Sequence, residues 1–527
     1  MGRVTRYRVV DERDAMRLLS GLEQRTRLVR DPGRAIERVV YETFDWRFLG
    51  ADTVLEHRVE ADDGALLVWR SITTGEVLGQ LPVHEVPRFV WHLPQTPVVE
   101  RLARVTEMRA IVPLVTLDTR LDSLRLIDDD DKTLARVTLD RSTARGGGPL
   151  PAVIDLNPVR GYDAEARALE ELLAAQIGLV PDTEDVTIAA LRAVGFAPGS
   201  YSSKLRLALD PASTALDAWT TVLRALFATM QANESGLRGD VDSEFLHDFR
   251  VAVRRTRSVL ADAKDIIDPD VRAWARDEFR WIGQVTSPPR DADVFLLALP
   301  AFEDALPGER RRDLKAFQAF LEEQQVRAHA ELVAALDTER YRSLTGRWRE
   351  LLDEGFSPAE GSARPEPPDA GAPAVGIAGA HIRKAHRRVI RDGRTINSAS
   401  HPEELHELRK EAKRLRYLLE CFGSLYPPDL VTPVVRELKD LQDVLGAYQD
   451  SQVQAEGIEQ LGQQMLEKHG APAAALLAMG GVVEHLDDIG RDARAQFAAR
   501  FAAFDTKSVR TSVEQLGRPK DGARSGG

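Results

Sequence analysis

The chain has 527 residues, more than three times the length of an ordinary domain, which predicts at least two domains. Its 71 basic and 83 acidic residues give a net charge of −12, so overall charge does not suit coating DNA or a membrane, and any anion site must be local. The single cysteine, Cys421, excludes a disulfide framework and a cysteine-based zinc site, and it fits a reducing compartment. The sequence shows no apolar stretch of membrane-spanning length and no apolar signal core, so we expect a cytoplasmic protein without a membrane partner.

The N-terminal part, residues 1–203, combines short segments rich in Val, Leu, Thr and Tyr with two helical stretches. The expected strands are residues 36–46, 53–59, 65–72, 76–83, 122–127 and 133–139, and the expected helices are 14–24 and 164–175. This spacing predicts an antiparallel β-sheet or barrel with flanking helices. The acidic run at 128–131 falls between two expected strands, where a hairpin turn is favoured over a calcium or magnesium site.

The rest of the chain reads as helical. Strand signals end near residue 211, and amphipathic segments follow one another to about residue 504. The Pro- and Gly-rich residues 356–376 predict a flexible linker between two helical parts, 211–355 and 377–505, and a disordered tail is expected from 506 to 527. The predicted fold class is therefore a two-domain α+β protein, with a sheet or barrel domain at 1–203 and an all-α domain at 211–505.

A repeat lies within the helical part. HDFRVAVRRTRSVL, which begins at His247, matches HELRKEAKRLRYLL, which begins at His406. With these two histidines aligned, the correspondence continues without a gap to Val294 and Val453. A duplicated helical unit is the simplest explanation. We expect each copy to be a four-helix bundle that buries its own apolar stripe.

The repeated pattern, H-x-x-R-x-x-x-[RK]-R-x-R, gives each helix one cationic face, because its fourth, eighth and eleventh positions return to the side of the first. Glu407 and Glu411 flank the second stripe, which leaves the central cations without acid partners. Stacked like charges repel without a counter-anion, and arginine forks and histidine nitrogens suit phosphate oxygens, although a solvated surface is the alternative. The two stripes comprise His247, Arg250, Arg254 and Arg257, and His406, Arg409, Lys413 and Arg416.

A third basic helix repeats the spacing with His381, Lys384, Arg388 and Arg391, whereas its first-copy counterpart at 222–232 is not basic. The second copy is therefore expected to contribute more positive charge.

These motifs, with PPRDADV at 288–294 and LQDVLGAYQD at 441–450, resemble the CHAD family of conserved-histidine α-helical domains over residues 211–505. The resemblance implies inorganic polyphosphate as the partner, held in a positive channel between the two cationic stripes. Thr286 and Ser287 replace the second copy's Leu445 and Gly446, a change that we do not expect to alter binding. The implied contacts are His247, Arg250, Arg254, Arg255 and Arg257 with His406, Arg409, Lys410, Lys413, Arg414 and Arg416, and more weakly Arg280 and Lys439. The repeated spacing of the third basic helix adds His381, Lys384 and Arg388 to the expected contacts.

Such binding should weaken steeply with salt through counterion release. The histidines, which titrate near 6.5 when unperturbed, should add affinity as the pH falls.

The N-terminal part resembles the CYTH family of triphosphate-tunnel barrels through YETFDWRFLGADTVLEHRVE at 41–60 and the later strands to Asp155. The family's E-x-E-x-K signature is missing, because the first strand, VTRYRVV, holds no acid and no lysine. The late strand, VIDLN, offers only Asp155, although Arg70, Arg109 and Arg120 could still meet an anion. We expect a degenerate tunnel domain with no cofactor and no metal.

The leading hypothesis is a non-catalytic polyphosphate-binding protein associated with cytoplasmic polyphosphate granules. The alternative is a metal-dependent triphosphatase or polyphosphatase that draws ligands from Glu56, Glu107 and Asp155. A scaffold or nucleic-acid-binding role is a further alternative. Nucleic acid is disfavoured because Phe249 and Tyr417 alone do not make a stacking platform.

Overall fold

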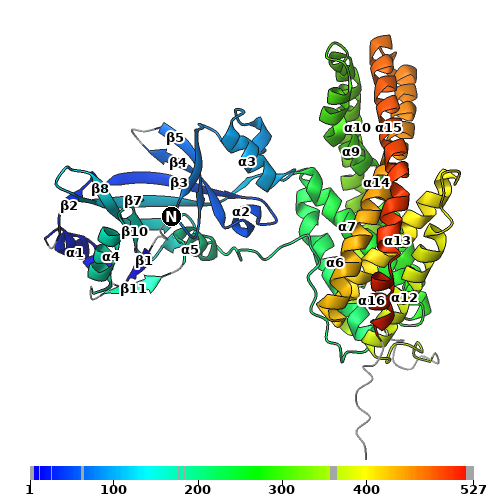
Figure 1. The fold of residues 1–527 in the computed structure, drawn as a ribbon, viewed down its shortest axis with the longest axis horizontal. Helices are drawn as coiled ribbons and strands as arrows, with labels where there is room; N and C mark the ends of the chain where they lie inside the picture. Colours follow the sequence, from blue (N-terminus) through cyan, green and yellow to red (C-terminus); the bar gives the residue numbers. More distant parts are fainter. Residues whose placement is uncertain are drawn as a thin grey trace, which may run out of the picture. The chain divides into compact units, whose positions relative to one another are not determined.

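The computed structural model describes residues 5–10, 12–24, 26–60, 64–175, 178–182, 184–356 and 365–517. The chain divides into two compact units, Met1–Ser203 and Lys204–Gly527 (Figure 1). Among the helices in these ranges, none combines the length and apolar character needed to cross a membrane. The predicted tail at 518–527 and the linker residues 357–364 lie outside the described residues.

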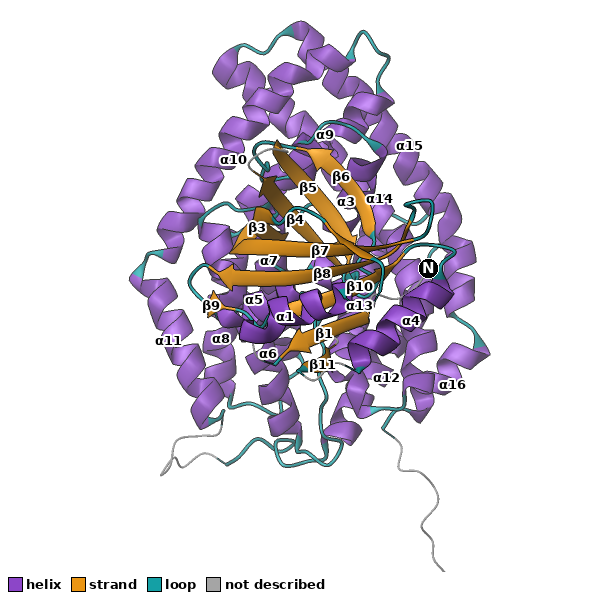
Figure 2. Ribbon diagram, turned by 90° about the vertical axis from the view of Figure 1, so that its left-hand side faces the viewer, coloured by secondary structure: helices purple, strands orange, loops and turns teal. Residues whose placement is uncertain are grey.

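The N-terminal unit is built on one antiparallel sheet, which confirms the predicted class. Its strand order is β11-β1-β10-β8-β7-β3-β4-β5-β6, with β2 beside β7 and β9 beside β8, and the path ends at β11 and β6 (Figure 2). The strands are β1 (Thr5–Val9), β2 (Leu28–Arg30), β3 (Arg34–Glu42), β4 (Thr53–Glu60), β5 (Gly64–Ser71), β6 (Val77–Pro82), β7 (Val112–Ile127), β8 (Thr133–Ala144), β9 (Gly148–Pro149), β10 (Val153–Pro158) and β11 (Leu179–Asp182).

Short helices cover the sheet. Leu19 of α1 and Leu169 of α4 pack against Val137 and Ile154 of the sheet in one core cluster, because alternate strand residues point to the same face. The acidic run forms the predicted β7–β8 turn, in which the Asp128 carboxylate accepts hydrogen bonds from the backbone of the following residues. The helices are α1 (Glu12–Glu23), α2 (Arg47–Gly50), α3 (Pro97–Thr106), α4 (Asp163–Ala174) and α5 (Val186–Ala193), with a 3-10 turn at Val90–His92.

The C-terminal unit is all helical, as predicted, and its two copies follow one another in chain order. The first copy holds α6 (Ala215–Arg238), α7 (Ser243–Ala261), α8 (Pro269–Val285), α9 (Ser287–Ala305), α10 (Lys315–Leu336) and α11 (Glu339–Glu354). The second holds α12 (Ala374–Gly393), α13 (Pro402–Phe422), α14 (Pro428–His469), α15 (Ala473–Phe504) and α16 (Lys507–Gln515), and 3-10 turns lie at Arg311–Leu314 and Gly423–Leu425. The long α14 takes the place of α8 and α9 together.

The two copies share part of their apolar core, which differs from the expectation that each copy buries its apolar residues by itself. Phe295 and Phe317 of the first copy share one core cluster with Ile458 and Met479 of the second.

The backbone also joins the two copies where each begins. The amide of Ala215 donates to the carbonyl oxygen of Ala372 at 2.7 Å. The amide of Ala374, which is the second copy's counterpart of Ala215, donates back to the carbonyl oxygen of Ser213 at 3.0 Å. The two copies are therefore tied together by reciprocal hydrogen bonds at equivalent positions.

The same hydrogen bonds correct the predicted linker. Its described part, residues 365–376, is tied to the first copy, because the amide of Asp369 also donates to the carbonyl oxygen of Asp265 at 2.9 Å.

The tail prediction is wrong for residues 507–515, which form α16 with Val509 and Val513 buried. This helix is the second copy's counterpart of α11. Arg383 of α12 donates to the carbonyl oxygen of Leu516 just after α16, as Arg224 of α6 donates to that of Leu352 in α11. Arg224 and Arg383 occupy equivalent positions when His247 is aligned with His406. The structural repeat therefore extends to α16, beyond the end of the sequence match at Val453.

Candidate anion-binding groove

The two basic helices place their apolar faces in the core, as the periodicity predicts. Asp242 caps α7 by accepting hydrogen bonds from the amides of Glu244 and Phe245, and Pro402 opens α13 at its first position. Burial of the apolar face of each helix fixes the helix's rotation about its axis, so the opposite, cationic face is left for polar contacts. The buried positions are Phe249, Val253 and Leu260 of α7 and Leu408, Ala412, Leu415 and Leu419 of α13.

Cations from both copies line one groove of about 710 Å³, here called the α7–α13 groove. Five of the eight stripe residues therefore share one surface depression, whereas Arg257, His406 and Arg416 do not line it. Its basic residues are His247, Arg250 and Arg254 of α7, Arg409 and Lys413 of α13, and Arg290 of α9, with Asp291, Asp450 and Glu456 as acidic neighbours.

The cations of the groove are incompletely neutralised. Within the described residues, no carboxylate lies within 4.0 Å of the charged atoms of Arg250, Arg254 or Lys413. Burial, together with repulsion from Arg409 and Arg254, lowers the pKa of Lys413 to about 8. Burial, followed by repulsion from Arg254, likewise lowers the pKa of Arg250 to about 10. Because these charges destabilise one another, the groove favours a bound anion.

The repeat histidines occupy equivalent places with opposite hydrogen-bond roles. The Nδ1 atom of His247 accepts from Arg290 at 3.0 Å, because a guanidinium can only donate. The Nδ1 atom of His406 lies 2.8 Å from Oε1 of Gln449 and donates to it. His247 therefore lies against a cation, and His406 lies against a neutral amide.

The change at Thr286 and Ser287 alters the hydrogen-bond partner of an arginine, and the expectation that it leaves binding unaltered stays a prediction. Nη1 of Arg250 donates to the hydroxyls of Thr286 at 2.9 Å and Ser287 at 3.0 Å. The second copy has Leu445 and Gly446 in these places, which offer no hydroxyl, and Arg409 instead pairs with Asp450 at 2.7 Å. The expectation of an acid-free central stripe is therefore wrong for Arg409.

Two predicted contacts hold the helices together instead. Arg255 of α7 pairs with Glu420 of α13 at 2.6 Å, and Arg414 of α13 pairs with Asp262 after α7. The two arginines occupy equivalent positions of the two copies, whereas their acid partners do not, because Asp262 aligns with Cys421. Neither lines the groove.

Other predicted contacts also lie outside the lining of the groove. Arg416 pairs with Glu420 and Lys410 pairs with Glu407, so Arg416 is a second exception to the acid-free stripe. Arg280 pairs with Asp277 at 2.6 Å, Arg257 is exposed near Arg276 and Arg280, and Lys439 is exposed on α14.

The third basic helix faces elsewhere. His381 contacts Asp262 at 3.3 Å, beside Arg414, while Lys384 and Arg388 line a different groove, between α12 and α16.

Arg290 is the groove cation that the sequence reasoning missed. It belongs to the PPRDADV motif, and its distance from His247 along the chain equals the distance of Gln449 from His406. This shared spacing is the signal that could have identified it.

The acids named for a hydrolase are all engaged by arginines in the N-terminal unit. Glu56 is fully buried and contacts Arg70 at 2.8 Å and Arg58 at 2.7 Å, and these cations, with Arg38, hold its pKa well below the ordinary value despite burial. Asp155 pairs with Arg6 at 2.7 Å, and the exposed Glu107 pairs with Arg47 at 2.8 Å.

The candidate arginines of this unit are similarly occupied or exposed. Arg70 bridges Glu56 and Asp185, Arg109 is buried 3.5 Å from Asp45, and Arg120 is exposed. Over the described part of the chain, no cluster of three or more His, Cys, Asp or Glu side chains is arranged to hold a metal ion.

Residues 221–459 match the family model described as the CHAD domain. The chain therefore contains a CHAD domain, and the resemblance carried by the repeated motifs is confirmed for this region. An uncharacterized Mycobacterium tuberculosis protein, Rv2226, is 28% identical over 218 residues, which are 41% of this chain and 40% of that protein. The chain thus matches less than half the length of that relative.

Among solved structures, the CHAD domain from the plant Ricinus communis matches with a TM-score of 0.42 and 24% identity, over 59% of this chain and 96% of that one. The putative adenylyl cyclase HpAC1 from Hippeastrum, described as having a dominant triphosphatase activity, matches with a TM-score of 0.28 and 13% identity, over 38% of this chain and all of that one.

Proposed function

We propose that the α7–α13 groove binds inorganic polyphosphate and that the protein holds this polymer without hydrolysing it. The observation that supports the proposal most is the meeting of both basic helices in one groove, where Arg254 and Lys413 have no acid partner within the described residues. A linear anion with one charge per phosphate would relieve their repulsion.

The layout of the groove favours a chain over a single phosphate ion. From His247 to Arg254 the cations of α7 extend over two helical turns, about 10 Å, and those of α13 line the same groove. Arginine forks bind two phosphate oxygens each, so consecutive phosphates can be held by successive side chains.

The test is retention of long-chain polyphosphate by the purified chain. Changing Arg250, Arg254, Arg409 and Lys413 together to alanine should abolish binding while circular dichroism and melting stay close to the parent. A matched control changes four exposed cations that form ion pairs elsewhere, Arg311, Arg342, Arg436 and Arg491, and should retain binding. Equal losses in both variants would reveal nonspecific charge attraction, and unchanged affinity in the groove variant would refute the proposal.

Phosphate release and cellular position test the two remaining parts of the proposal. Incubation with polyphosphate and magnesium or manganese should release no phosphate, whereas metal-dependent release would assign catalysis to the chain. A fluorescent fusion should collect on polyphosphate granules in the cytoplasm, and the groove variant should spread evenly. A granule signal that survives the groove changes would assign the localisation to another surface.

A further inference from the structure

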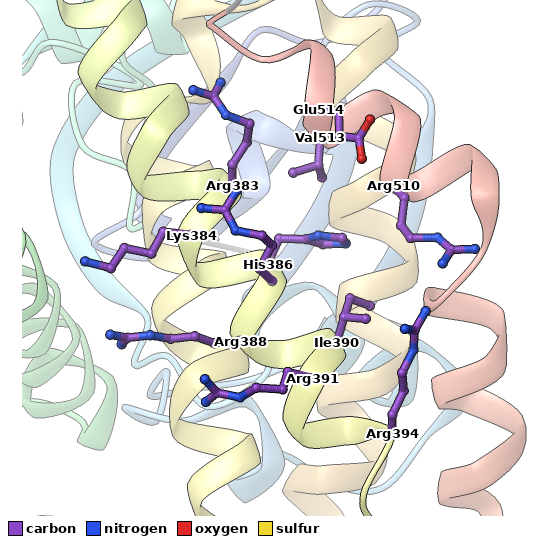
Figure 3. Close-up of a pocket in the computed structure, with 11 residues that line it drawn as sticks. Arg383, Lys384, His386, Arg388, Ile390, Arg391, Arg394, Arg510, Val513 and Glu514 are labelled. Atoms are coloured by element: carbon purple, nitrogen blue, oxygen red, sulfur yellow. The ribbon is translucent and has the colours of Figure 1, made fainter.

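A second basic groove lies between α12 and α16, away from the residues that line the α7–α13 groove. Its volume is about 670 Å³, and its lining holds seven lysine or arginine residues and one acid. Figure 3 shows the basic side chains of α12 beside Arg510 and Glu514 of α16. The lining cations are Arg383, Lys384, Arg387, Arg388, Arg391, Arg394 and Arg510, and the acid is Glu514.

Several of these cations have acid partners, yet an excess of charge remains. Arg388 pairs with Glu411, Arg391 with its neighbour Asp392, and Arg394 with Asp505. The side chain of Arg383 donates to a backbone carbonyl oxygen, which carries no net charge. Within the described residues, Lys384 and Arg387 have no carboxylate within 4.0 Å.

The duplication supplies an internal control for what the fold requires. In the first copy, α6 and α11 are joined by the equivalent hydrogen bond, from Arg224 to the carbonyl oxygen of Leu352. Arg383 aligns with Arg224, but at the positions that align with the other five basic residues the first copy carries small residues. Lys384, Arg387, Arg388, Arg391 and Arg394 correspond to Ala225, Ala228, Thr229, Ala232 and Ser235. The architecture thus forms without these cations, so their presence in the second copy calls for a reason other than folding.

A buried histidine departs from the first copy in the same way. His386 corresponds to Phe227, which is buried in the first copy. The histidine is only 5% exposed, and its Nε2 atom has no hydrogen-bond partner within the part of the chain that the structure describes. Figure 3 shows its ring extending from α12 toward α16, between the basic side chains. A buried polar atom without a partner is unfavourable, and it suits a site that a ligand completes.

We propose that the α12–α16 groove is a second binding site for oligophosphate anions, separate from the α7–α13 groove. The cations of α12 run from Arg383 to Arg394, about 16 Å along one side of the helix, which matches a chain of phosphates better than a single ion. Arginine forks supply paired donors for its oxygens, and Nε2 of His386 can supply one more. The apolar lining residues, Ile390 and Val513, are aliphatic and provide no stacking surface for nucleic-acid bases.

The internal control also supplies the test variants. Lys384→Ala, Arg387→Ala and Arg391→Ala together give α12 the residues that the first copy already tolerates at these positions. Isothermal titration with tripolyphosphate should show two classes of site in the parent chain and one in this variant, with the lost class at least roughly tenfold weaker. A control with Arg311→Ala, Arg342→Ala and Arg491→Ala should keep both classes.

A second background separates this proposal from the proposed function. In a chain with Arg254→Ala and Lys413→Ala, any tripolyphosphate binding that remains should disappear when the α12 changes are added. Binding that is indifferent to the α12 changes in both backgrounds would overturn the second site and leave the α7–α13 groove unaffected. If the α12 changes weaken the binding of poly-glutamate but not that of tripolyphosphate, the assignment of the site to phosphate is wrong.

Discussion

Arg290 donates a hydrogen bond to Nδ1 of His247 across 3.0 Å, from the start of a different helix. The second copy repeats the geometry with a neutral partner, because Gln449, at the position equivalent to Arg290, contacts His406. The duplication has thus kept the orientation of the histidine while the charge of its partner differs. One copy adds a cation to the groove at this place, and the other does not.

This relationship predicts the effect of Arg290→Gln. The variant gives the first copy the second copy's residue, so the fold should be kept and melting should change little. Polyphosphate affinity should fall several-fold, because one groove cation is lost. Titration by fluorescence anisotropy, with melting as the control, measures both quantities. An unchanged affinity would show that Arg290 positions His247 without contacting the anion.

Lys413 predicts how binding depends on pH in the alkaline range. Its pKa is lowered to about 8 by burial and by Arg409 and Arg254, and a bound anion favours the charged form. Affinity should therefore decrease as the pH rises from 7 to 9, where free Lys413 loses its proton. Lys413→Arg should bind with little change over this range, since arginine keeps its charge. An identical pH profile in the two proteins would exclude Lys413 as the titrating group.

Arg414 is expected to matter for stability and not for binding. Its removal in Arg414→Met takes one of two cationic or polar partners from the buried carboxylate of Asp262 and leaves the contact with His381. We expect a loss of about 1–3 kcal/mol in the free energy of unfolding, measured by urea denaturation. Polyphosphate affinity should stay near that of the parent chain. A lower affinity at unchanged stability would show that Arg414 contacts polyphosphate.

The same contact has a pH window. Burial tends to raise the pKa of Asp262, but hydrogen bonds from His381 and Arg414 lower it overall. Because the folded-state pKa lies below the unfolded value, the contribution to stability is complete above about pH 4 and is lost as the pH falls further. In Arg414→Met the folded-state pKa of Asp262 should rise toward the unfolded value, so the loss of stability on acidification should become smaller, which acid titration of the unfolding free energy would detect.

In the N-terminal unit, Arg70 joins two buried carboxylates, those of Glu56 and Asp185. Arg70→Met would leave both acids buried without this partner, and we expect it to destabilise the unit by about 3–5 kcal/mol. Adding Glu56→Gln and Asp185→Asn should recover part of the loss. Calorimetry would follow the unfolding of this unit, with polyphosphate binding by the helical unit as the control. A neutral effect of Arg70→Met would show that the network does not stabilise the fold.

The sequence predicts the groove through periodicity, because the spacing within H-x-x-R-x-x-x-[RK]-R-x-R determines which side chains share a face. It does not predict which cations find acids on other helices. Glu420 lies four residues after Arg416 on the same helix, so that pair follows from the helical spacing. The contact of Glu420 with Arg255 depends instead on how α7 and α13 pack. Long-range pairing of this kind depends on tertiary geometry, which a one-helix pattern does not contain.

The last helix of the second copy, α16, was not predicted for a related reason. The sequence of α16 is short and mostly polar, with only two valines, Val509 and Val513, on its buried side. The copy-to-copy comparison of Arg224 with Arg383 reveals the equivalence, because both donate to the end of the last helix of their copy. Compositional signs of disorder were therefore misleading for residues 507–515.

The central claim is that cations from both copies engage one polyphosphate chain in the α7–α13 groove. The most direct measurement is the dependence of the binding constant on salt for the parent chain, Arg254→Ala, Lys413→Ala and the double variant. Each removed cation should reduce the slope of log K against log salt concentration by about 1, and the double variant by the sum. Slopes that stay unchanged, or that respond to only one of the two helices, would contradict a groove shared by both copies.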